Sequence, residues 1–207
     1  MFNTLYMISA PSGAGKSSLL QRILKKKLIC NIQLSISYTT REIREGELHK
    51  KHYFFISKEK FQNMIKNNYF LEYAKVFGNY YGTSKKMIEG ILSAGIDVLL
   101  DIDWQGAQQI RRKIPNSCSI FILPPSLKEL SRRLYSRRQD SEKIITKRLL
   151  QVHKEMVHYI EYDYLIVNDC FDSAVRDLQI IVESERLRIN KQQFFHNTLI
   201  KNLLNNL

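Results

Sequence analysis

The sequence is poor in cysteine, with only Cys30, Cys118 and Cys170 among its 207 residues. Three is an odd number and the positions lie far apart, so no pair has the spacing of a zinc site or a redox dithiol. We therefore expect reduced thiols and a cytoplasmic protein.

The sequence also lacks long apolar runs. No run approaches the roughly 20 residues that a membrane-spanning helix needs. The start, MFNTLYMISA, has neither the basic region nor the apolar length of a secretory signal. These absences predict a protein with no membrane partner, and the length of 207 residues suits one domain with subdomains.

Negative charge is scarce, because 20 Asp and Glu face 32 Lys and Arg and leave a net charge of +12. Clustered positive charge can bind nucleic acid by releasing its counterions. A compositional drift toward Ile, Asn and Lys, or a cleft for small phosphate substrates, produces the same excess. We predict no nucleic-acid partner.

Short apolar runs alternate with helical patterns along the chain. The runs are rich in Ile, Val and Leu, which is typical of strands covered on both faces, and they span residues 5–9, 96–100, 119–123 and 164–167. The helical patterns span residues 16–27, 105–113, 127–137, 143–159 and 173–190. This alternation predicts a three-layer α/β core with a parallel sheet, whose strand order stays open.

Three segments interrupt the alternation. Short β-like pieces rich in aromatic residues indicate a β-rich insertion at residues 34–83. An arginine-rich connection between two helices, at residues 131–143, indicates a mobile basic flap. The apolar residues after Asn190 predict an amphipathic helix that docks either on the core or on another subunit of a homo-oligomer.

The stretch SAPSGAGKSS, residues 9–18, indicates a phosphate-binding loop between a strand and a helix. Lys16 is expected to reach the outer phosphates of a nucleotide, and the Ser17 hydroxyl to hold a magnesium ion. Ala10 replaces the usual opening glycine, at a strand end that need not require a positive φ. A turn with an N-capping serine is the alternative, but it leaves the lysine and the two hydroxyls after it unexplained.

The insertion offers groups that suit a phosphate monoester and a purine base. Two arginine forks and two phenols favour a phosphate dianion, with a glutamate nearby: these residues are Arg41, Arg44, Glu47, Tyr53 and Tyr81. Glu72 and Asp103 lie beside expected strand ends, where an α/β sheet binds its ligands. Carboxylates accept hydrogen bonds, so they favour guanine, which offers N1–H and an amino group, with hydroxyls from Ser37 and Thr83 completing the pocket. Each carboxylate taken alone could also be an ordinary strand-end charge.

Several stretches resemble bacterial guanylate kinases in their order and spacing: SAPSGAGKSSL, SYTTREIREGE, HYFF, FLEYAKVFGNYYGTS, LDIDWQGAQQI, FILPPS and YDYLIVND. The resemblance covers about residues 4–190. It implies a P-loop kinase core (about 1–34, 94–125 and 158–190), a GMP-binding subdomain (about 35–93) and a helical lid (about 126–157), and the apolar pattern after Asn190 adds a C-terminal helical tail (191–207). The implied reaction converts ATP and GMP into ADP and GDP with Mg²⁺.

The resemblance also assigns site residues. The ATP-binding set is Ala10, Pro11, Ser12, Gly13, Ala14, Gly15, Lys16, Ser17, Ser18 and Asn168. The GMP-binding set is Ser37, Arg41, Arg44, Glu47, Tyr53, Glu72, Tyr81, Thr83 and Asp103. The catalytic set is Lys16, Arg44, Arg133, Arg137 and Arg148, and the magnesium shell is Ser17 and Asp101. Lys50 and Arg138 depart from the family pattern, because glycine is common at both positions, and they put loop geometry and lid kinetics in question.

Three rival functions differ in what they need from the chain. A non-catalytic guanylate-kinase-like module that binds phosphopeptides could lose its phosphate loop, whereas the loop and the lid arginines are present here. A nucleic-acid-binding protein would keep its affinity for polyanions in saturating GMP and ATP. A kinase for another nucleoside monophosphate conflicts with the two base-pocket carboxylates. His153 and His158 are five residues apart, which favours surface histidines over a metal site.

Overall fold

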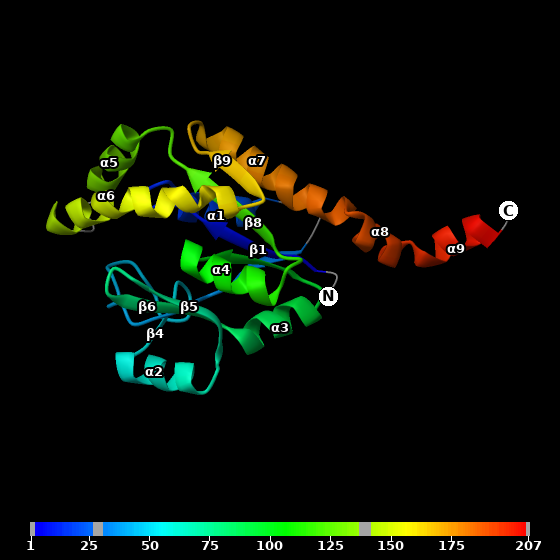
Figure 1. Cartoon of the computed structure of the whole chain (residues 1–207), viewed down its shortest axis with the longest axis horizontal. Coiled ribbons are helices and arrows are strands. Elements are labelled where there is room, and N and C mark those ends of the chain that lie inside the picture. The colour runs from blue at the N-terminus through cyan, green and yellow to red at the C-terminus, as the bar shows by residue number, and fades with distance from the viewer. Residues whose placement is uncertain (1–2, 27–30, 137–141, 206–207) are drawn as a thin grey trace.

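A five-stranded parallel sheet runs through the centre of the computed structural model, which describes residues 3–26, 31–136 and 142–205 (Figure 1). Its strand order is β2-β7-β1-β8-β9, and all four neighbouring pairs are parallel. The strands are β1 (Leu5–Ser9), β2 (Ile32–Leu34), β7 (Asp97–Asp101), β8 (Cys118–Leu123) and β9 (Tyr164–Val167). The loops after β1 and β7 therefore leave the same edge of the sheet side by side.

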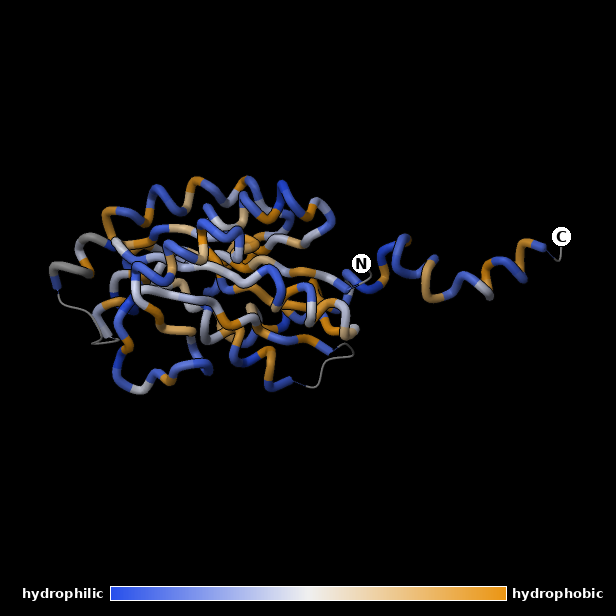
Figure 2. Tube along the Cα trace, turned by 90° about the horizontal axis from the view of Figure 1, so that it is seen from below, coloured by the Kyte–Doolittle hydropathy of each residue, from blue (hydrophilic) through white to orange (hydrophobic). Residues whose placement is uncertain are grey.

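Helices cover both faces of this sheet. Tyr6 and Ile8 of β1 pack against α1 (Lys16–Lys25) and α7 (Phe171–Ser184), whereas Leu5 and Met7 pack against α3 (Lys85–Ser93) and α4 (Trp104–Lys113). The apolar residues therefore gather inside, between the layers (Figure 2). The three-layer α/β prediction is confirmed.

A second, smaller sheet follows in the insertion. Its order is β4-β3-β6-β5, with β3 (Tyr38–Thr39), β4 (Phe54–Phe55), β5 (Phe70–Val76) and β6 (Asn79–Ser84). The strands β5 and β6 form an antiparallel hairpin, and α2 (Lys58–Lys66) packs on the sheet through the buried Phe61, whose ring stacks on Phe70. The insertion at residues 34–83 is therefore β-rich as predicted, but it also holds α2, and α3 follows directly after it; the sequence analysis missed both helices.

The helices α5 (Leu127–Ser136) and α6 (Glu142–Met156) form a pair above the carboxyl edge of the main sheet. Leu130, Leu134, Ile145 and Val152 make a small core of their own between them. A 3₁₀ turn, η1 (Val157–Glu161), returns the chain to β9. The predicted helix over residues 143–159 therefore ends earlier, at Met156, and the predicted flap lies partly outside the described residues.

The end of the chain leaves the body as an arm. After α7 and the 3₁₀ turn η2 (Glu185–Leu187), the helices α8 (Ile189–Phe195) and α9 (Asn197–Asn205) extend away from the sheet (Figures 1 and 2). The single tail helix of the sequence analysis is therefore two helices that meet near His196. In the part of the chain that the structure describes, no helix is both long and apolar enough to cross a membrane.

Element positions follow the sequence closely where the apolar pattern is strong. The bounds of β1 and β9 match the prediction, and β7, β8 and α4 differ by one residue. The analysis missed β2, because three residues at the edge of the sheet carry no readable periodicity and Gln33 is exposed. Cys30 and Arg138 lie outside the described residues.

Candidate active site

The phosphate loop connects β1 to α1 and is shaped by its glycines. Gly13 and Gly15 both adopt φ of 96°, a left-handed conformation that favours glycine. Ala10 is not among the described non-glycine residues with positive φ, so its side chain fits the strand end without strain. Gly15 is the N-cap of α1 and no side chain caps the helix. The N-capping serine of the alternative interpretation is therefore absent from this helix start.

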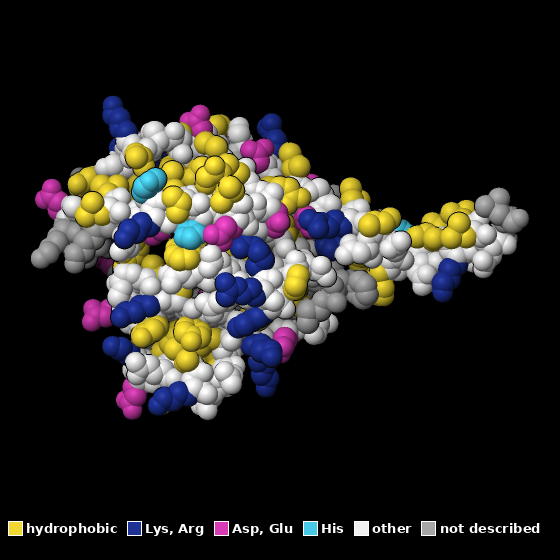
Figure 3. Space-filling view, viewed as in Figure 1, with side chains coloured by type: hydrophobic (Ala, Val, Ile, Leu, Met, Phe, Trp, Pro, Cys, Tyr) yellow, Lys and Arg dark blue, Asp and Glu magenta, His cyan; other side chains and the backbone are white. Residues whose placement is uncertain are grey.

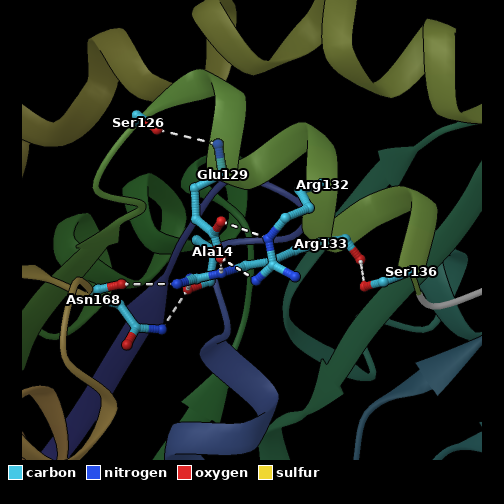
Figure 4. Close-up of polar contacts among 7 residues, drawn as sticks. All are labelled: Ala14, Ser126, Glu129, Arg132, Arg133, Ser136 and Asn168. Atoms are coloured by element: carbon cyan, nitrogen blue, oxygen red, sulfur yellow. Dashed lines mark hydrogen bonds and ion pairs between the residues drawn. The ribbon is translucent and has the colours of Figure 1, made fainter.

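Asn168 supports the loop from behind (Figure 4). Its buried side-chain amide donates to the Ala14 carbonyl at 2.7 Å. A Cβ on Gly15 would collide with the same amide nitrogen. Close approach and positive φ thus both require glycine at this position.

Arg133 also lies at the back of the loop. It reaches from α5 and donates to the carbonyls of Ala14 (3.4 Å) and Asn168 (3.2 Å), while Glu129 accepts from its Nε at 2.8 Å (Figure 4). Arg133 therefore fixes the position of α5 on the phosphate loop.

Lys16 begins α1 and points toward the end of β7. Its Nζ lies 2.6 Å from an Asp101 oxygen and donates to the Ile102 carbonyl at 3.0 Å. The ammonium is thus held at the carboxyl edge of the sheet, where two neighbouring parallel strands end.

Ser17 and Asp101 line the same cleft and offer oxygen ligands. Among the described residues, no group of three or more His, Cys, Asp or Glu side chains could hold a metal. Mg²⁺ commonly binds one or two protein ligands and completes its shell with phosphate oxygens and water. A hydroxyl and a carboxylate fit that ion when a nucleotide supplies the remaining oxygens.

Glu72 lies in the opposite wall of the cleft. It pairs with Thr83 across the β5–β6 hairpin, and the Thr83 hydroxyl donates to its Oε1 at 2.5 Å. The residue is 3% exposed. Burial raises the pKa of Glu72 to about 7, the Thr83 hydrogen bond opposes this shift, and the Asp103 carboxylate adds to it.

Gly106 allows α4 to approach Glu72 closely. A Cβ on Gly106 would lie 2.5 Å from Oε2 of Glu72. Asp103 caps the same helix by accepting the Gly106 N–H at 2.9 Å, and burial raises the pKa of Asp103. The two carboxylates are therefore brought together by one helix start, and sequence reasoning missed the glycine that permits this.

The insertion arginines are held by Glu47. Its carboxylate accepts from the Arg41 guanidinium at 2.7 Å and from the Arg44 backbone N–H at 2.9 Å. Burial alone would raise the pKa of Glu47, but these two hydrogen bonds lower it below its ordinary value. The Arg41 guanidinium also lies over the Tyr53 ring, 5.5 Å from its centroid. Glu47 thus orders the arginine pair.

The helix α6 closes over the phosphate loop through Ser12. Arg148 donates to the Ser12 hydroxyl at 3.1 Å, and Glu155 accepts the Ser12 N–H at 3.3 Å. Glu155 lines the cleft, and burial raises its pKa. Sequence reasoning missed Glu155, because nothing in the pattern of α6 separates it from a solvated helix charge.

Trp104 and His158 link the cleft to the end of this helix pair. Their rings stack with centroids 3.7 Å apart and an interplanar angle of 10°. His158 also pairs with Glu161 at 2.6 Å. His153 is a surface histidine as expected, whereas His158 is half-buried in a packing contact.

One cleft collects most of the sites predicted from sequence. It is lined by Ala10, Pro11, Ser12, Gly13, Gly15, Lys16, Ser17, Ser37, Arg44, Tyr53, Glu72, Tyr81, Asp101, Asp103 and Arg148. The predicted residues that do not line it are Ala14, Ser18, Arg41, Glu47, Thr83, Arg133 and Asn168. Thr83 and Glu47 bond to the lining residues Glu72 and Arg44, respectively. Asn168 and Arg133 bond to the carbonyl of Ala14 in the phosphate loop. Arg137 lies outside the described residues.

Lys50 shows what one departure from the family pattern involves. It adopts φ of 67° and donates its N–H to the Tyr53 carbonyl at 2.9 Å. The backbone thus keeps a left-handed turn at this position although a lysine occupies it.

Comparison with known proteins gives a consistent result. The model of the guanylate kinase family matches residues 3–185. The guanylate kinases of Escherichia coli strain K12 and Salmonella typhimurium strain LT2 are each 59% identical over 201 residues, which is 97% of this chain and 97% of each relative. The crystal structure of guanylate kinase from Anaplasma phagocytophilum superposes with a TM-score of 0.74 at 34% identity, covering 90% of this chain and 88% of that one.

Proposed function

The chain belongs to the guanylate kinase family and is an ATP:GMP phosphotransferase, and we propose that the cleft between the phosphate loop and the smaller sheet is its active site. One observation carries this proposal: Lys16 on one wall faces the same cleft as the buried carboxylate Glu72 and the half-buried Asp103 on the other. The loop that would bind phosphates and the pocket that would accept hydrogen bonds from a base thus open into one cleft.

ATP binds on the phosphate-loop wall in this proposal. The backbone N–H groups of the loop and the start of α1 receive its phosphates, and Lys16 leaves Asp101 to reach the outer ones. The residues from Ala10 to Ser18 form the loop that binds ATP, and Asn168 supports this loop and contacts the adenosine of ATP. Ser17 and Asp101 hold Mg²⁺, which when bound neutralises charge on the phosphates.

GMP binds on the opposite wall. Arg41, Arg44, Tyr53 and Tyr81 receive its phosphate, with Glu47 fixing the two arginines. Glu72 and Asp103 accept from the N1–H and amino group of guanine, and Ser37 and Thr83 supply hydroxyls around them. Because Glu72 is buried and Asp103 half-buried, leaving either carboxylate without a donor is costly, so the pocket selects a base that donates.

The transfer itself needs positioned charge rather than a base. The attacking oxygen of GMP is already anionic, so no residue has to remove a proton from it. Lys16 and Arg44 stabilise the negative charge of the transferring group together with Arg133, Arg137 and Arg148 from the lid, residues 126–157. Outside the lid, the core comprises residues 1–34, 94–125 and 158–190, the GMP-binding subdomain residues 35–93 and the C-terminal tail residues 191–207.

A coupled assay with one donor and several acceptors tests this assignment. ATP is supplied with GMP, AMP, UMP or dTMP, and ADP release is followed at equal acceptor concentrations. We expect turnover with GMP alone. Comparable turnover with AMP would contradict the base pocket, and retention on a polyanion column in saturating GMP and ATP would contradict the prediction of no nucleic-acid partner.

The C-terminal arm supports a homo-oligomer. Its apolar side chains are more than half exposed (Figure 3): Phe194, Phe195, Leu199, Leu203 and Leu204. Lys201 is the only charged side chain of α9, so two copies of this helix can pack face to face without strong repulsion. We propose that the arm of one chain packs on the arm of a second.

Light scattering after size exclusion tests the arm. Leu199→Asp combined with Leu203→Asp is expected to lower the measured mass to that of one chain. Ile180→Asp on the exposed face of α7 is the matched control and should leave the mass unchanged. Equal masses for the wild type and the arm variant would contradict the proposal.

We also propose that the enzyme works in the cytoplasm. Cys118 and Cys170 are both free thiols, one buried and one exposed, and exposed thiols persist best in a reducing compartment.

A further inference from the structure

The β5–β6 hairpin turns at Phe77 and Gly78, and the turn is unusual for its sequence. Val76 pairs with Asn79, so the loop has two residues, with φ of 48° at Phe77 and 86° at Gly78. Two-residue hairpin loops with both φ values positive strongly favour Asn-Gly or Asp-Gly, because Asn and Asp tolerate the left-handed conformation. A phenylalanine there strains the backbone without helping the turn.

The Phe77 side chain makes a contact that asparagine could not. Its ring lies beneath the guanidinium of Arg148, with the Arg148 Cζ 5.3 Å from the ring centroid. The same guanidinium donates to the Ser12 hydroxyl of the phosphate loop at 3.1 Å. Phe77, Arg148 and Ser12 all line the active-site cleft. One arginine on α6 thus touches both walls of the cleft.

We propose that Phe77 is a positioning residue for phosphoryl transfer, and that its ring holds the Arg148 guanidinium between the GMP wall and the phosphate loop. A planar guanidinium is attracted to the face of an aromatic ring, whereas an aliphatic side chain of similar size offers only contact area. The strain at Phe77 is then retained for function, because the ring is needed at the point where the hairpin tip meets the lid. The inference rests on the proposed role of Arg148 in the transfer.

Three substitutions at Phe77 separate the effect of the aromatic ring on kcat from the effect of the strained turn. Phe77→Asn relieves the strain and removes the ring, Phe77→Leu keeps the strain and an apolar side chain, and Phe77→Tyr keeps the ring and its face. We expect kcat to fall about three- to thirty-fold in the Asn and Leu variants, which corresponds to losing one cation–π contact. The KM for GMP should change less than about threefold, and the Tyr variant should keep wild-type kcat.

Thermal unfolding supplies the readout that a purely structural role would not produce. Phe77→Asn should unfold at the same or a higher temperature than the wild type although it is the slower enzyme. If Phe77 only shapes the hairpin, the Asn variant keeps full kcat, and the inference is overturned. A Leu variant as active as the Tyr variant also overturns it.

Arg148→Ala distinguishes failure of this inference from failure of the proposed mechanism. If Arg148→Ala keeps wild-type kcat, the proposed catalytic role of Arg148 is wrong. If Arg148→Ala is slow, adding Phe77→Asn should slow it no further, because the ring acts through the arginine. Additive losses would show that Phe77 acts by another route and would overturn the inference.

Discussion

The phosphate-loop wall of the cleft comes from one short stretch of chain, residues 10–17, whereas the opposite wall gathers side chains from segments more than 60 residues apart, such as Ser37 and Asp103. The first wall presents mainly backbone N–H groups, shaped by two left-handed glycines. The second presents carboxylates, phenols and guanidinium groups whose positions depend on strand pairing and on one helix start. Backbone binding tolerates side-chain variation such as Ala10, while side-chain binding depends on the chemistry of each residue.

Electrostatics divide the two walls in the same way. The phosphate-loop wall offers the positive end of α1 together with Lys16, so it suits the polyphosphate of ATP. The opposite wall combines buried carboxylates that read a base with arginines that receive a single phosphate. Variants can therefore break one wall and leave the other intact.

Lys16→Met should have the largest effect, because it removes the one charged side chain that the phosphate-loop wall contributes. We expect kcat to fall at least about a hundredfold, since preorganised charge supplies much of the transition-state stabilisation in phosphoryl transfer. GMP affinity, measured by calorimetry, should stay within about threefold of wild type. Retention of more than about a tenth of wild-type kcat, a loss under about 1.4 kcal/mol, would contradict the assignment.

Glu72→Gln should reduce the preference of the opposite wall for GMP over AMP. The wild type should prefer GMP over AMP by about 10⁴-fold or more, because the unprotonated N1 of adenine would face a carboxylate. The amide can donate to that nitrogen, so the variant should lose at least about tenfold in kcat/KM for GMP and the preference should shrink. IMP, which keeps N1–H but lacks the amino group, should lie between GMP and AMP in the wild type.

The ratio of kcat/KM for GMP to kcat/KM for AMP shows whether Glu72 contacts the base. An unchanged ratio of GMP to AMP in Glu72→Gln would show that Glu72 does not read the base. ATP affinity is the internal control, because the phosphate-loop wall should not respond.

Gly106→Ala should weaken GMP binding without a change in any polar group. The added Cβ would lie 2.5 Å from Oε2 of Glu72, so the carboxylate or α4 has to shift. Overpacking of this kind costs about 1 to 3 kcal/mol, and we expect the KM for GMP to rise about tenfold. Gly90→Ala in α3 is the matched control, because nothing lies within 4 Å of its new Cβ. The control should be slightly more stable and equally active, and equal KM values in the two variants would contradict the close approach at Gly106.

The sequence carries most of the phosphate-loop wall because that wall is local. Lys16, Gly13 and Gly15 have fixed spacing within one strand-loop-helix unit, and four of the five strands of the main sheet show continuous apolar runs. The ends of β7 differ from the prediction by one residue and the end of α6 by three, because strand and helix ends depend on capping and on tertiary contacts.

The other wall is harder to predict because long-range pairing creates it. Nothing local indicates that Gly106 lets α4 approach Glu72, or that Glu155 reaches the Ser12 N–H. The chain does give one local sign of the Phe77 contact, since Phe-Gly occupies a turn where Asn-Gly is expected. That sign is readable only once the two-residue loop is known, because a longer connection would place no such demand on the residue.

The free energy of unfolding of the free enzyme should depend on pH through Glu72. The pKa of Glu72 is about 7 in the folded protein, against 4.5 for an ordinary glutamate, the value expected in the unfolded chain. A raised pKa means that the folded chain binds the proton more tightly, so the stabilising contribution is complete below about pH 4.5 and is lost as the pH rises through about 7. The free energy of unfolding of the wild type, relative to Glu72→Gln, should therefore fall by up to about 3 kcal/mol across this range. The comparison with the variant removes the contributions of carboxyls that do not interact with Glu72.

Substrate binding should reverse this dependence, and it is the smallest effect we expect. Guanine needs the ionised carboxylate of Glu72 as its acceptor, so the KM for GMP should decrease as the pH rises from 6 to 8, by at most about tenfold for a group with a pKa near 7. The phosphate of GMP also titrates near this range, but it does so equally with Glu72→Gln, whose amide does not ionise. The ratio of the two KM values therefore isolates Glu72. A ratio that is constant between pH 6 and 8 would place the titration of Glu72 outside this range or its carboxylate outside the base pocket, and the pH dependence of unfolding would distinguish the two.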